Sequence, residues 1–187
     1  MAVGRRRRNK AANLTVSNYL SAVNQKLLFA EQLSMLVAKK ASGSNQHLEI
    51  AVAQSITVQL YQAWVWHLQD MASNYRLKNP AAVYNTADLV NALQLEGKQP
   101  AEAVELHNLS GQPGSWVMAL LNAHRQLYLV PEVRSAQMDA DRLPVVAIDT
   151  LSSDSGGIGN LSLAEVRGWV VQMRELVERH REMMVEF

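Results

Sequence analysis

The feature that most constrains the fold is one long segment, residues 44–77, that is apolar on nearly every side of the helix it predicts. Its middle runs from Ala51-Val52-Ala53 to Ala63-Trp64-Val65-Trp66 and is broken mainly by glutamines. A helix without a polar side is usually buried centrally or shared with a partner. We therefore expect this helix, capped by Ser44 or Asn45, to be the spine of the fold.

A second long helix is predicted before the spine. Its apolar residues recur at spacings of three and four, or a multiple, as a buried helical face requires. They are Val16, Leu20, Val23, Leu27, Ala30 and Val37. Gly43 ends this helix.

The C-terminal segment gives the clearest helix signal. Ser162 and Glu165 have the spacing of a capping box, in which each side chain satisfies an N–H group of the other residue. The apolar positions then repeat for three heptads as a seam that packs on another helix, within the chain or across a dimer. The seam consists of Leu163, Val166, Val170, Met173, Val177, His180 and Met184.

Three shorter helices are expected between the long ones. One is capped by Thr86 and ends at Gly97, one runs from Pro100 to Gly111, and one from Ser115 to Tyr128. The sequence therefore predicts an all-α helical bundle. It has two long antiparallel N-terminal helices, short middle helices and a long C-terminal helix.

Two irregular segments flank or interrupt this domain. Residues 1–12 are predicted to be a disordered basic tail, and residues 13–187 a single helical domain with an irregular loop at 129–160. Within the loop, an apolar strap at 144–151 is expected to lie across the helices. Gly156 to Gly159 is interpreted as a flexible linker, because no Lys follows it as in a phosphate loop.

The composition excludes several classes of protein. The chain has no Cys, which rules out disulfides, Cys-ligated zinc, iron–sulfur clusters and thiol nucleophiles. No apolar run is long enough for a membrane helix, and residues 11–20 are too polar for the core of a signal peptide. We expect a cytoplasmic protein without integral membrane association.

The N-terminal charge run is the sharpest functional signal. Five positive charges fall in the first ten residues, while the other 13 Lys and Arg face 17 Asp and Glu, a formal charge of −4. The five residues are Arg5, Arg6, Arg7, Arg8 and Lys10. Such a segment binds DNA or RNA non-specifically by releasing counterions, and an anionic membrane surface or a merely solvated tail are the alternatives.

One pair of residues matches an enzyme pattern. Arg174 and His180 are separated by five residues, as in the Arg and His motif of HEPN-type ribonucleases. A neutral His could act as a general base toward a ribose hydroxyl while Arg steadies the phosphate. The two residues stand about 240° apart round a helix, however, and His180 falls on the apolar seam. An interface histidine beside a surface arginine is the competing interpretation.

The remaining histidines predict neither a metal site nor a cofactor. His67 and Asp70 are three residues apart on the spine and could share a face, but two groups do not make a metal site. His47, His107 and His124 are interpreted as surface or partly buried side chains.

The spine also carries Trp64 and Trp66, which stand about 200° apart round a helix and cannot both enter one core. One of them is expected to face a second surface. That surface is a covering helix, a ligand groove or a partner, with the strap at 144–151 the favoured cover.

Three stretches of the chain carry a resemblance to a known family. They are Asn18-Tyr19-Leu20 with Lys26-Leu27-Leu28-Phe29-Ala30, Ser115-Trp116-Val117-Met118 with His124, and Leu163-Ala164-Glu165-Val166-Arg167-Gly168-Trp169. They resemble a family of small bacterial helical proteins that is defined only as a domain of unknown function. The resemblance covers residue 18 to the C-terminus. It implies a bacterial cytosolic protein and supplies no catalytic or binding residues.

Two functional hypotheses follow. The leading one is a non-enzymatic helical interaction or adaptor protein that contacts nucleic acid through the Arg-rich tail and binds a protein partner or a second copy through helical faces. The alternative is a HEPN-type RNA-processing enzyme that uses Arg174 and His180. Removal of both side chains separates the hypotheses, since only a ribonuclease needs them.

Overall fold

The computed structural model describes residues 3–38, 46–129 and 161–185. Throughout these ranges the chain is helical or irregular and forms no strand, which confirms the all-α prediction. The helices are α1 (Val3–Ala38), α2 (Gln46–Asn74), the short 3-10 helix η1 (Pro80–Ala82), α3 (Thr86–Leu95), α4 (Ala101–Gly111), α5 (Trp116–Gln126) and α6 (Leu163–Val185). None of the described helices has the length and apolarity needed to cross a bilayer.

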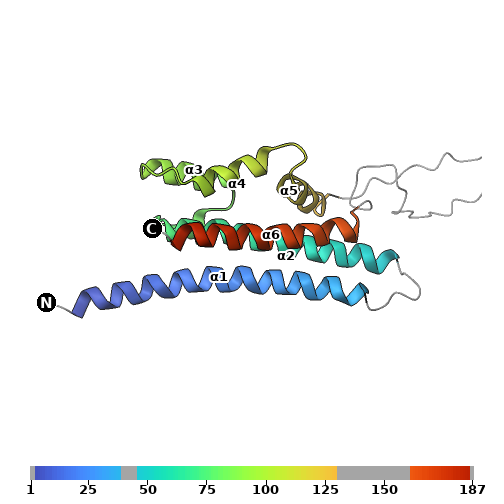
Figure 1. Cartoon of the computed structure of the whole chain (residues 1–187), viewed down its shortest axis with the longest axis horizontal. Helices are drawn as coiled ribbons and strands as arrows, with labels where there is room; N and C mark the ends of the chain where they lie inside the picture. The colour runs from blue at the N-terminus through green and yellow to red at the C-terminus, as the bar shows by residue number, and fades with distance from the viewer. Residues whose placement is uncertain (1–2, 39–45, 130–160, 186–187) are drawn as a thin grey trace, which may run out of the picture.

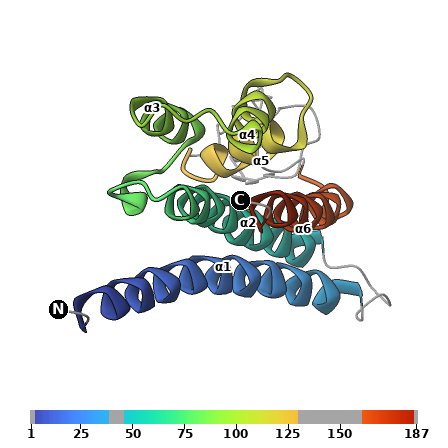
Figure 2. The ribbon, with the colours of Figure 1, turned by 60° about the vertical axis from the view of Figure 1, so that its left-hand side comes forward.

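The helices form three layers, and α2 lies in the middle one. α1 runs antiparallel to α2 along one side, as the sequence predicts, and α6 lies beside α2 in the same direction (Figure 1). The short helices α3, α4 and α5 cover the opposite side (Figure 2). The C-terminal halves of α2 and α6 therefore meet under α4.

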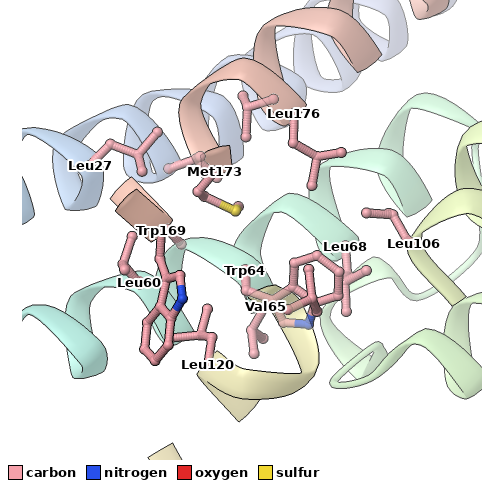
Figure 3. Close-up of a cluster of buried hydrophobic side chains, with 14 of the residues drawn as sticks. Leu27, Leu60, Trp64, Val65, Leu68, Leu106, Leu120, Trp169, Met173 and Leu176 are labelled. Atoms are coloured by element: carbon pink, nitrogen blue, oxygen red, sulfur yellow. The ribbon is translucent and has the colours of Figure 1, made fainter. Parts of the chain in front are cut away.

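The apolar surface of α2 explains its central place. Each turn of α2 from Val52 to Ala72 contains buried residues. Trp64 and Leu68 are at most 1% exposed. Figure 3 shows these two side chains in one cluster with Leu106 of α4, Leu120 of α5 and Met173 of α6. A fully buried side chain of this size contributes roughly 1.5 to 3 kcal/mol to folding. The prediction that this helix is the spine is confirmed.

The apolar seam of α6 packs inside the chain. Val166, Val170, Met173 and Val177 are buried against the core, and the backbone N–H of Glu165 donates to Ser162 Oγ over 3.1 Å at the start of the helix. The predicted N-cap is therefore present. Because α1, α2 and α5 cover this seam, it needs no second chain to bury it.

Two helix ends differ from the prediction. Asn85, not Thr86, caps α3, because Asn85 Oδ1 accepts from the N–H of Asp88 over 2.9 Å. The Thr86 hydroxyl instead lies 2.8 Å from Ser110 Oγ and ties α3 to α4. α2 ends at Asn74, short of the predicted Leu77, because Arg76 takes a left-handed conformation with φ 58°.

The start of α1 includes the arginine-rich segment. The helix begins at Val3, whereas the sequence predicts a disordered tail over residues 1–12, which stays a prediction. Arg, Lys and Ala are strong helix formers, which accounts for helix in this segment. The first turns of α1 extend past the last turn of α6 in both views (Figures 1 and 2).

The second tryptophan of α2 is partly covered by α1. Trp64 is buried, whereas Trp66 is half-buried and has Lys26 Nζ 5.3 Å from its ring centroid. A cation over a tryptophan face is a favourable contact. Of the surfaces predicted for the second tryptophan, α1 is thus a covering helix. The strap at 144–151 and the glycines at 156–159 lie outside the described residues, as do Gly43, Ser44 and Asn45.

Candidate functional site

Buried ionisable side chains gather where α2, α4 and α6 meet. His67 is 1% exposed, Asp70 2%, Glu102 4% and His180 0%. Burying such groups costs free energy unless they are paired or change their protonation. Clusters of buried titratable groups are also where functional sites concentrate. This junction is therefore the candidate functional site.

A chain of hydrogen bonds links the three helices at this junction. His67 Nε2 on α2 lies 3.0 Å from His180 Nδ1 on α6, and their rings are stacked with 19° between the planes. His180 Nε2 lies 3.1 Å from Glu105 Oε2 on α4. The other oxygen of Glu105 accepts from the guanidinium of Arg179. The chain thus runs from a partly exposed ion pair to a fully buried ring.

The Glu105 carboxylate determines where the imidazole protons lie. An ionised carboxylate only accepts, so His180 Nε2 carries the proton and donates to it. In a neutral His180, Nδ1 is then the acceptor, and His67 Nε2 must donate to it. His67 Nδ1 is left as a bare lone pair, and this buried atom has no hydrogen-bond partner.

Burial keeps both histidines neutral. Burial, together with the charge of a protonated His180, lowers the pKa of His67 from 6.5 to about 3. Burial also lowers the pKa of His180, although the hydrogen bond and charge of Glu105 oppose that shift. For Glu105, burial raises the pKa, but the contacts with His180 and Arg179 outweigh it and hold the pKa below its usual value.

Asp70 lies one turn after His67, and burial shifts its pKa in the opposite direction. Burial raises its pKa from 3.8 to about 6, although the charge of Arg181 and a hydrogen bond from Asn74 lower it. The bond from Asn74 Nδ2 to Asp70 Oδ2 is long, at 3.4 Å, and Asp70 Oδ1 has no partner. At neutral pH this carboxylate is therefore a poorly compensated buried charge.

A second carboxylate of α4 contacts the residue that follows α2. The Tyr75 hydroxyl lies 3.2 and 3.3 Å from the two oxygens of Glu102 and donates to them. Burial and the neighbouring Glu102 raise the pKa of Tyr75 to about 12, so the phenol stays protonated. The Lys98 ammonium donates to the carbonyl of Tyr75 over 2.8 Å. The start of α4 is thus tied by polar contacts to the turn that follows α2.

This arrangement is a store of protonatable groups. The two imidazoles and Glu105 form a continuous hydrogen-bonded path from the core to the partly exposed carboxylate. Across the described ranges, no three His, Asp or Glu side chains are placed to hold a metal ion. His67 and His180 are too deeply buried to touch a substrate in this conformation.

The structure places the predicted HEPN pair on different partners. Arg174 donates to Glu31 of α1 through Nε at 2.9 Å and Nη2 at 2.5 Å. His180 instead faces His67 and Glu105 in the interior. The structure therefore does not bring Arg174 and His180 together on a shared partner, and the ribonuclease assignment stays a prediction.

The predicted nucleic-acid residues lie in the first turns of α1. Arg5, Arg6, Arg7, Arg8 and Lys10 all fall within Val3–Ala38, but their side chains lie outside the described ones. The described cluster at α2, α4 and α6 contains none of them.

Sequence reasoning missed the histidine pair and its carboxylate partner. His67 and His180 were available as polar residues on two apolar helical faces, which is the pattern of partners that satisfy each other in a core. They are 113 positions apart, however, and no local spacing relates them to each other or to Glu105.

The described part of the chain defines an all-α protein in which a buried histidine–carboxylate network joins three helices. The model of a family of unknown function (DUF6586) matches residues 18–187, and the chain belongs to this family. This confirms the predicted resemblance and its extent. The match begins after the arginine segment. Comparison with curated proteins and with solved structures gives no match.

Proposed function

We propose that this protein is a non-enzymatic helical interaction protein that contacts nucleic acid through the arginine segment of α1. The supporting observation is the extension of α1 past the bundle, because the segment with five cationic residues lies at its projecting end (Figures 1 and 2). A polyanion can approach such an end without meeting the acidic body. Phosphate neutralisation there releases counterions and needs no base contacts.

The outer side of α1 supports the interaction part of the proposal. Leu28, Met35 and Leu36 are 48%, 57% and 60% exposed, and their spacing of seven and eight residues places them on one helical face. Exposed apolar side chains that share one helical face are more typical of a contact surface than of a solvated helix. A second copy or another protein is the predicted partner, and sedimentation velocity of the purified chain distinguishes these two.

The test removes charge and keeps the helix. In one variant Arg5, Arg6, Arg7, Arg8 and Lys10 all become Gln, a comparably good helix former. Fluorescence anisotropy then follows binding to a short DNA duplex and to a single-stranded RNA of equal length as salt is varied. If all five charges contact duplex phosphates, the wild-type plot of log affinity against log salt has a slope of about −4.5. The variant should lose this salt-dependent binding.

The matched control replaces exposed cations of the body, Lys78 and Arg125, by Gln. It should retain wild-type affinity. Equal binding by the five-residue variant contradicts the proposal, and so does binding confined to vesicles with anionic lipids. The ribonuclease alternative is tested in the same preparation, since cleavage of the RNA probe that disappears in Arg174→Ala would establish an enzyme.

A further inference from the structure

The feature that carries a further inference is the way α4 is attached to the rest of the bundle. Its inner side has two buried apolar anchors, Ala103 and Leu106, at 2% and 0% exposure. Leu109 is partly buried against the same core, and the polar contacts of α4 with Tyr75 and with α6 involve Glu102 and Glu105. The helix is therefore held in large part by groups whose strength depends on protonation.

The network has one end in water and one in the core. The Glu105 side chain is 34% exposed and that of Arg179 50%, whereas His180 beyond them is fully covered. Figures 1 and 2 show α4 over the C-terminal half of α6. Displacement of α4 therefore removes the Glu105 partner and admits water to both imidazoles.

The closed arrangement resists protonation by its geometry. With His67 Nε2 only 3.0 Å from His180 Nδ1, both rings cannot carry a proton on the facing nitrogens at once. Two buried cations at this separation would also repel each other strongly. Once hydrated and apart, each imidazole titrates at its ordinary value. Opening of α4 is therefore coupled to proton uptake.

Some of the charged groups that face the two histidines favour their protonation, and others oppose it. From α4, Glu105 and Glu102 favour a proton on His180, while Arg179 on α6 opposes it. On α2, Asp70 takes up a proton in the closed state near pH 6, which offsets part of the coupling if it also becomes hydrated. On opening, two imidazoles take up protons and only one carboxyl group opposes this effect. Acid therefore favours the open state overall.

We propose that the His67–His180–Glu105 chain is an acid-sensitive latch, which holds α4 against α2 and α6 at neutral pH and releases it on mild acidification. The latch goes beyond the proposed nucleic-acid contact and does not depend on it. It gives the protein a second state in which the inner side of α4 and the C-terminal halves of α2 and α6 become accessible.

The test measures hydrogen exchange of the full chain by mass spectrometry at pH 7.5 and pH 5.5, corrected for intrinsic exchange rates. Two hydrated imidazoles lower the protection of the α4 amides by up to about 100-fold over this interval, and the Asp70 offset reduces the loss to about 25-fold. Protection in α1 between Leu20 and Val37 should fall less. An equal fall in α1 would mean global unfolding and overturn the latch.

His67→Gln is the decisive variant, because its amide still donates to His180 Nδ1 but does not titrate. Its α4 protection should respond to pH about 10-fold less than the wild type. The matched control is His47→Gln, an exposed histidine at the start of α2 that should leave the response unchanged. A wild-type response in His67→Gln overturns the proposal.

Should that variant not fold, the comparison of α4 with α1 in the wild type still tests the latch. Unchanged protection of α4 between the two pH values would reject it.

Discussion

At the scale of single residues, two helix ends have the same backbone geometry but different amino acids at the left-handed position. After α2, the N–H of Leu77 donates to the carbonyl of Ala72, and Arg76 between them has φ 58°. After α3, the N–H of Lys98 donates to the carbonyl of Leu93, and Gly97 has φ 69°. Both are Schellman ends, in which a left-handed residue closes the helix. Only Gly takes that conformation without steric cost.

We expect Arg76→Gly to raise the free energy of unfolding by roughly 0.5 to 1 kcal/mol, because it removes the strain of a left-handed Arg. Gly97→Ala should lower it by about 1 kcal/mol for the reverse reason. A Cβ at Gly97 meets no atom within 4 Å, so crowding adds nothing to that loss. Urea titrations of the two variants measure both effects, and equal signs would show that strain is not the cause.

Residue-level predictions from sequence succeeded where the signal was local. The end of a helix at Gly97 and the cap at Ser162 follow from residue type and spacing alone. The left-handed Arg76 has no such signal, because Arg rarely takes this conformation. Thr86 was a wrong choice of cap, since Asn85 beside it is an equally good capping residue and tertiary contacts with α4 engage the Thr hydroxyl.

At the scale of elements, α6 is fastened to α1 by polar contacts beside its apolar seam. Arg174 pairs with Glu31, and the Arg167 guanidinium donates to the carbonyl of Ser34 over 2.5 Å. The Arg174 and Glu31 side chains are 39% and 32% exposed, so water screens the pair. Arg174 thus has a structural role that is sufficient to explain its position.

A double-mutant cycle with Arg174→Met and Glu31→Gln tests that role. Partly exposed ion pairs couple weakly, so we expect a coupling of about 0.3 to 1 kcal/mol and single variants that fold normally. Thermal unfolding supplies the four free energies. Zero coupling would leave Arg174 without a stabilising partner and return weight to the ribonuclease hypothesis.

Periodicity in the sequence predicts each helix but not its neighbours. The seam of α6 indicated that another helix covers it, and left open whether this helix belongs to the same chain. The parallel placement of α2 and α6 brings together residues 113 positions apart, such as His67 and His180, and no local pattern specifies it. For this reason the network at their C-terminal halves could not be predicted, although each of its histidines was visible.

At the scale of the whole molecule, the buried groups predict how stability depends on pH. His67 has a lowered pKa, so its contribution is fully present above pH 6.5 and is lost as pH falls toward about 3. Asp70 has a raised pKa, so the folded state gains stability as pH falls from about 6 to 3.8. The net loss from these two groups should therefore occur between pH 6.5 and 6 and again below pH 3.8, with little change between pH 6 and 3.8.

Asp70→Asn removes the opposing group. The variant should be more stable than the wild type at pH 7.5 by up to about 3 kcal/mol, since each pKa unit corresponds to about 1.4 kcal/mol. This advantage should shrink as pH falls below 6 and approach zero below pH 3.8, where wild-type Asp70 is protonated in both states. Urea unfolding at pH 7.5, 5.5 and 4.5 measures the difference. An advantage that is constant with pH would mean that burial of the charge is not its cause.

The projecting start of α1 has an electrical consequence for the entire molecule. Five positive charges lie in the first turns of α1 and the remainder of the chain has a formal charge of −4, so the two parts have opposite net charge. In the field around a rod-like polyanion a torque acts on such a molecule before any atoms touch. Rotational alignment would then precede docking, so collisions would begin with the same extremity foremost.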